Sequence, residues 1–131
     1  MRRRANSGIL FVNLLGGFRV AGPTATDVLH FERKKTRALL SMLALDPGQV
    51  LPRGKIAALL WPDHDDEAAR HALRQCLLDL RHVLATVSQD ALRVEGDLIH
   101  LEPSTVIVDV ARFERHVAQR TAEALQEAVA L

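Results

Sequence analysis

Short apolar runs separated by turn signals occupy the N-terminal part of the chain. Two of them, 9–15 and 18–21, flank a Gly-Gly pair, an arrangement typical of a β-hairpin. A third run over 28–31 follows a Gly-Pro turn and predicts one more strand. This part of the chain therefore predicts an antiparallel sheet.

Apolar residues at helical spacing follow in three stretches. The first, 34–45, stops at an Asp-Pro-Gly turn. The second is short; we expect Pro52 in its first turn and its end before Pro62. The third, 67–85, follows an acidic loop that supplies an N-cap.

The residues of the third predicted helix divide into two faces when they are placed about 100° apart. One face is apolar and contains Ala69, Leu73, Cys76, Leu77, Leu80, Val83 and Leu84. The opposite border gathers Arg70, Arg74 and Arg81 within about 40°, with His71, Gln75 and His82 beside them. One face is therefore expected to pack, and the other offers hydrogen-bond donors.

A second hairpin and a helical tail complete the pattern. Apolar runs at 92–94 and 98–101 flank a Glu-Gly-Asp turn, and a strand is predicted at 106–108. Asp109 is expected to cap a helix that runs to about Arg120, and a further helix follows it.

The order of these elements is that of a winged helix-turn-helix. We expect an α+β fold over 1–108, with a three-helix core, an N-terminal antiparallel sheet and a C-terminal β-hairpin wing. The start of an α-helical region is expected over 109–131.

Composition agrees with this domain organisation. The chain has 131 residues, 48% hydrophobic and 25% charged, which suits one globular domain with a fragment of a second. The longest nearly uncharged stretch, 7–15, is far shorter than the ~20 apolar residues of a membrane span, so no membrane partner is expected. The single cysteine, Cys76, fits a reducing cytoplasm. A net charge of +1 hides basic blocks in 1–45 and 68–85, which folding can bring together.

Short stretches along nearly the whole chain resemble the OmpR-type winged-helix domain of SARP and related BTAD-containing regulators. They begin at Leu15 (LGGF), Lys35 (KTRALL), Pro47 (PGQV), Leu59 (LLWPD), Ala69 (ARHALRQ), Leu80 (LR) and Val108 (VDVARF). The resemblance implies a bacterial transcriptional regulator whose partner is double-stranded promoter DNA. It also implies that Asp109 opens the helical BTAD region, which in the family continues beyond Leu131.

In a winged helix the third helix enters the major groove. The candidates for contacts with base edges are Arg70, His71, Arg74 and Gln75. Arginine binds guanine and glutamine binds adenine through paired hydrogen bonds; the alternative is a solvated helix face. Leu78 lies among these residues, where it can contact a thymine methyl group, although packing against the wing is the expectation.

Other basic residues are candidates for backbone phosphate or wing contacts, namely Lys34, Lys35, Arg37, Arg81 and Arg93. The alternatives are a soluble face for the first three and a brace for the wing in the case of Arg81. Asp79 is expected to repel phosphate. The wing tip carries Glu95 and Asp97, so we expect the wing on the backbone or minor groove without deep insertion.

The acidic residues before and at the start of the third helix are Asp63, Asp65, Asp66 and Glu67. Capping of the helix is their simplest role. In OmpR-type domains the matching loop can face RNA polymerase, so the resemblance leaves that contact open. A homodimer on direct repeats is left open in the same way.

Catalysis has little support in the sequence. The six histidines are scattered, without a His-Glu-x-x-His motif, a Gly-x-Ser-x-Gly motif or a phosphate-binding loop. We therefore expect no enzyme, no metal and no cofactor.

The alternative function is a protein-interaction (adaptor) module. It would use two apolar stripes of the tail, formed by Val110, Phe113 and Val117 and by Leu125 and Val129. Their competing roles are to cover the domain's own sheet or to contact further BTAD helices.

Overall fold

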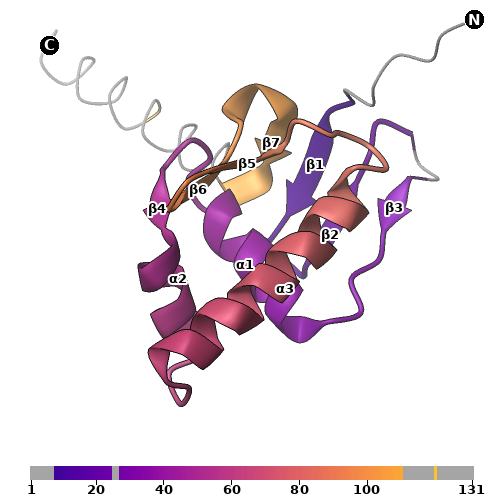
Figure 1. Cartoon of the computed structure of the whole chain (residues 1–131). Coiled ribbons are helices and arrows are strands. Elements are labelled where there is room, and N and C mark those ends of the chain that lie inside the picture. Colours follow the sequence, from indigo (N-terminus) through magenta and orange to yellow (C-terminus); the bar gives the residue numbers. More distant parts are fainter. Residues whose placement is uncertain (1–7, 25–26, 111–119, 121–131) are drawn as a thin grey trace, which may run out of the picture.

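Figure 1 shows the computed structural model of the chain, which describes residues 8–24, 27–110 and 120. The elements are β1 (Leu10–Asn13), β2 (Arg19–Ala21), β3 (Val28–Leu29), α1 (Lys34–Ala44), β4 (Leu51–Pro52), α2 (Arg53–Leu60), α3 (Asp66–Leu84), β5 (Leu92–Glu95), β6 (Leu98–Leu101), the 3-10 turn η1 (Pro103–Thr105) and β7 (Val106–Val108). The expected α+β winged-helix order is confirmed.

The N-terminal sheet has the strand order β3-β2-β1-β7. β1 and β2 form the predicted antiparallel hairpin, and Gly16 and Gly17 at its turn have φ angles of 77° and 133°, which suit glycine. β7 pairs with β1 in parallel, with Leu10 opposite Val106. A strand at β7 was expected from the sequence, but its partner was not, because parallel neighbours are distant in the chain.

The wing sheet has the strand order β4-β6-β5. β5 and β6 form the predicted hairpin, with Gly96 at φ 62° in the turn. The expectation that Pro52 lies in the first turn of the second helix was wrong, since it is extended at φ −69° and ψ 143° and pairs with β6 as part of β4. Proline is accepted there because an edge strand does not need its missing N–H.

The helices pack around one apolar core between the two sheets, and α3 runs diagonally across the front of the view in Figure 1. The apolar face predicted for α3 is confirmed, since its buried residues are Ala69, Leu73, Cys76, Leu77, Leu80 and Leu84. Val83 is partly buried against the same core. Trp61, at the end of α2, is also buried.

Asp109 joins the end of β7 to the N-terminal hairpin. Its Oδ1 accepts a hydrogen bond from the N–H of Leu14 at 2.8 Å, and its Oδ2 accepts one from the N–H of Leu15 at 2.9 Å. Val110 packs partly against the core. These contacts attach both residues to the winged helix, while most of the helical region expected over 109–131 lies outside the described residues.

The rest of the expected tail lies outside the described residues. This applies to Phe113, Val117, Leu125 and Val129 of the two apolar stripes. No helix in the described part of the chain is long and apolar enough to cross a membrane.

Candidate nucleic-acid interface

The start of α3 is built by the acidic loop before it. Asp65 is the N-cap, and its Oδ1 accepts a hydrogen bond from the N–H of Ala68 at 2.7 Å. The sequence predicted an N-cap in this loop without identifying the residue that forms it. Asp66 and Glu67 lie in the first turn, where negative charge favours the positive end of the helix. Asp63 and these three residues are all exposed.

The outward face of α3 carries the residues expected to contact bases. Arg70, His71, Arg74 and Gln75 are all exposed, and so are Arg81 and His82 in the second half of the helix. Leu78 is 60% exposed in the middle of this face, so the expectation that it packs against the wing was wrong. The tip of the hairpin lies near Arg70, about two helical turns before Leu78.

The wing tip borders this face on the side of Arg70. The guanidinium of Arg70 lies 3.9 Å from Oδ1 of Asp97 in an ion pair of two exposed side chains. Arg53, at the start of α2, holds the same turn, because its backbone N–H donates to the carbonyl of Asp97 at 2.8 Å and its Nε donates to that of Gly96 at 3.0 Å. The tip of the wing is therefore attached to both α2 and α3.

The start of α1 borders the face on the side of Gln75. An open groove of about 460 Å³ lies between α1 and α3 and is lined by Arg33, Lys34, Lys35, Trp61, Ala72, Gln75 and Cys76. The α3 face thus lies between the wing and a group of cations.

These cations differ in whether they already form contacts within the protein. Lys34 is exposed. The Nζ of Lys35 donates a hydrogen bond to the carbonyl of Leu60 and lies 5.7 Å from the ring centroid of Trp61. Lys35 therefore stabilises the end of α2, where carbonyl groups lack helical partners. Arg33 was not among the expected site residues, and only the packing of α1 beside α3 reveals it.

The remaining expected phosphate contacts do not share one surface. Arg37 is half-buried and lines a groove with Phe18 and His30, on the side of the N-terminal sheet. Arg93, on β5, has its Nε 4.0 Å from Oε2 of Glu102. Arg81 is exposed on α3, so both of its expected roles remain open.

Asp79 turns toward α1 and is not a free surface charge. It accepts a hydrogen bond from Oγ1 of Thr36 at 2.8 Å, and Thr36 is fully buried. Cys76 lies on the same side of α3; burial raises the pKa of its thiol, and a hydrogen bond with Thr36 opposes this. The packing of α1 on α3 thus gives Asp79 a structural partner that the sequence did not reveal.

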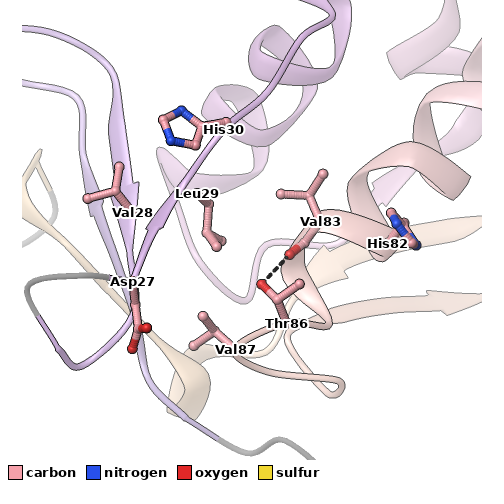
Figure 2. A pocket seen from close by; sticks show the side chains of 8 residues that line it. All are labelled: Asp27, Val28, Leu29, His30, His82, Val83, Thr86 and Val87. Carbon is pink, nitrogen blue, oxygen red and sulfur yellow. Dashed lines mark hydrogen bonds between the residues drawn. The ribbon is translucent and has the colours of Figure 1, made fainter.

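A second groove, of about 420 Å³, lies between β3 and the end of α3 (Figure 2). His30 and His82 lie on opposite sides of it, and Oγ1 of Thr86 donates a hydrogen bond to the carbonyl of Val83 at 2.8 Å. Within the described ranges no group of histidine, cysteine, aspartate and glutamate has the arrangement needed to hold a metal ion.

Comparisons with known proteins bear on the family and the fold of the chain. The family model described as transcriptional regulatory protein, C terminal, matches residues 30–97, just over half of the chain. Among solved structures, the fold is similar to that of Mycobacterium tuberculosis EmbR in complex with a low affinity phosphopeptide, with a TM-score of 0.62 and 20% sequence identity. That match covers 76% of this chain and 27% of the other, so this chain spans less than a third of the neighbour's length. No curated protein sequence matches the chain.

Proposed function

The chain belongs to the family of C-terminal domains of transcriptional regulatory proteins, which are DNA-binding domains, and we propose that it binds specific double-stranded promoter DNA through α3. The observation that carries the proposal is the position of the exposed face of α3 between the wing tip and the basic start of α1. A helix of this kind fits the major groove, while its two borders reach the flanking backbone.

Direct contacts with bases are proposed for the first half of α3. Arg74 is the strongest candidate, because it is exposed and, among the described residues, forms no ion pair with the wing tip, whereas Arg70 does. Gln75 lies beside the basic groove, and His71 is exposed one turn before it. Arg70 reaches a base edge only when DNA displaces Asp97.

Contacts with phosphate are proposed on both borders. Lys34 is exposed at the start of α1, and Lys35 and Arg33 line the same groove. Arg93 supplies the positive charge of the wing, while the carboxylate of Asp97 at its tip opposes insertion between phosphates. The wing is therefore proposed to lie along the backbone or over the minor groove.

Other partners are proposals of lower rank that the same family suggests. The exposed Asp63, Asp65, Asp66 and Glu67 form an acidic patch that suits a contact with RNA polymerase. A homodimer on direct repeats is proposed from the resemblance to OmpR-type domains alone. Promoter binding by a bacterial regulator would take place in the cytoplasm.

The adaptor function keeps little support among the described residues. Val110 begins the proposed tail stripe, and it packs partly against the core of the winged helix itself. That contact supports the competing role, in which the stripe covers the domain.

The test is selection of duplexes from a random library, followed by fluorescence anisotropy over a range of salt concentrations. Binding through phosphates predicts that the logarithm of the association constant falls linearly with the logarithm of salt, and specific binding predicts enriched sequences. Arg19→Ala, an exposed arginine on β2, is the charge control for variants of α3. An adaptor would enrich no sequence and would show no salt dependence on DNA.

A further inference from the structure

Leu78 is an exposed leucine surrounded by polar side chains. It is 60% exposed. Its neighbours one turn away on α3 are Arg74, Gln75, Arg81 and His82, all of them exposed. Leu78 is not among the described residues that pack against the domain's core.

The position of Leu78 on the helix is central. At about 100° per residue it lies about 80° from Arg70, which meets the wing tip, and about 60° from Gln75, which meets the basic groove. It therefore points away from the domain midway between the two borders. A duplex that contacts both borders places its major groove opposite Leu78.

We propose that Leu78 is a specificity-determining residue that contacts the 5-methyl group of a thymine. This methyl group is the one apolar feature among the base edges of the major groove, and apolar side chains recognise it there. The inference rests on the proposed DNA binding and adds to it one identified base. Arg74 and Gln75 supply donors nearby, so Leu78 extends their contacts by about one helical turn.

Charge argues against a second copy of the chain as the partner of this face. Two copies placed face to face would bring together Arg70, Arg74 and Arg81 from each. Like charges at an interface disfavour association. DNA is a polyanion that presents thymine methyl groups in its major groove, so it can bind both the arginines and Leu78.

The experiment uses the whole chain and the duplex selected by it. Each thymine in that duplex is replaced in turn by deoxyuridine, which removes only the methyl group. At one thymine the replacement is expected to weaken wild-type binding about fourfold, the effect of uncovering a single methyl. Leu78→Ala is expected to weaken binding by a similar factor and to lose its sensitivity at that thymine.

Leu45→Ala is the matched control, because Leu45 is 55% exposed at the far end of α1. It should keep the wild-type response to every deoxyuridine. Circular dichroism checks that Leu78→Ala, an exposed change to a good helix former, stays folded. If Leu78→Ala responds to each replacement as the wild type does, the inference is overturned while DNA binding stands. If no duplex is enriched at all, the proposed function itself fails.

Discussion

The guanidinium of Arg70 lies 3.9 Å from the carboxylate of Asp97 and connects the start of the third helix to the tip of the wing. Both side chains are more than half exposed, so the pair contributes little to stability. The position of the pair matters more, because in the proposed complex the negative charge of Asp97 lies where the DNA backbone approaches. Removing that charge should therefore affect binding more than folding.

Asp97→Asn is expected to raise the affinity for every duplex by about two- to fivefold, since it removes a repulsion and releases Arg70. The thermal unfolding midpoint should hardly change. Anisotropy at fixed salt measures the affinity. Asp90→Asn is the control, because Asp90 is exposed near the other end of β5 from the tip. An equal gain in both variants would assign the effect to net charge.

Arg74→Ala is expected to weaken binding to the selected duplex by about 1–3 kcal/mol and to relax the preference at one base pair. The reason is that an exposed arginine in the first half of α3 can bind a guanine edge with two hydrogen bonds. Repeating the selection with the variant measures the preference. The same loss on random duplexes would assign Arg74 to a phosphate.

Lys34→Ala should weaken all duplexes alike and lower the salt slope by about 1, because it removes one phosphate contact. Lys35→Ala should in addition lower the free energy of unfolding, since its ammonium group binds the carbonyl of Leu60 and lies over Trp61. Urea unfolding separates the two variants. An unchanged slope for Lys34→Ala would place that residue away from DNA.

Asp79→Ala is expected to lower the free energy of unfolding by about 1–3 kcal/mol, because the buried hydroxyl of Thr36 loses its acceptor. Thr36→Val combined with Asp79→Ala should cost less than the two changes added. Strict additivity in urea unfolding would show that the bond contributes nothing. Asp79→Asn should leave DNA affinity nearly unchanged, whereas a surface carboxylate near phosphate would give a clear gain.

The lowered pKa of Asp109 leads us to expect that the free energy of unfolding depends on pH. Desolvation by burial alone would raise its pKa, but hydrogen bonds from the N–H groups of Leu14, Leu15 and Val110 outweigh it and lower the pKa below its usual value. The folded-state pKa is below the unfolded one, so the stabilisation is present above the unfolded pKa of about 3.9 and is lost as pH falls through the folded value.

Asp109→Asn should therefore be less stable than the wild type at neutral pH, and the difference should shrink as the solution is acidified below pH ~4. Thermal unfolding at several pH values measures this. Asp63→Asn removes a charge from the exposed loop before α3 and serves as the control. A difference that stays constant down to the lowest pH would exclude the charged form of Asp109 as its source.

Local patterns in the sequence predicted the hairpins, the three helices and the two faces of α3, but not the short strand β4. The Gly-Gly and Glu-Gly-Asp turns predicted both hairpins, and helical spacing separated the buried Leu73 and Leu80 from the exposed Arg74. Asp65 was found as part of the capping loop because a cap acts on residues close to it in the chain. Such signals depend on a few neighbouring residues, so they can be recognised from the sequence alone.

Only the tertiary structure decided which groups that are distant in the chain form hydrogen bonds or line the same groove. The hydroxyl of Thr36 donates a hydrogen bond to Asp79 across 43 positions of the chain, and the backbone N–H of Leu14 donates one to the side chain of Asp109 across 95. Lys35 lies in the groove beside α3 while Arg37 lines a groove beside the N-terminal sheet, although both belong to one basic run. No spacing rule encodes these contacts, because they exist only after the packing of α1, α3 and the two sheets has set the direction of each side chain.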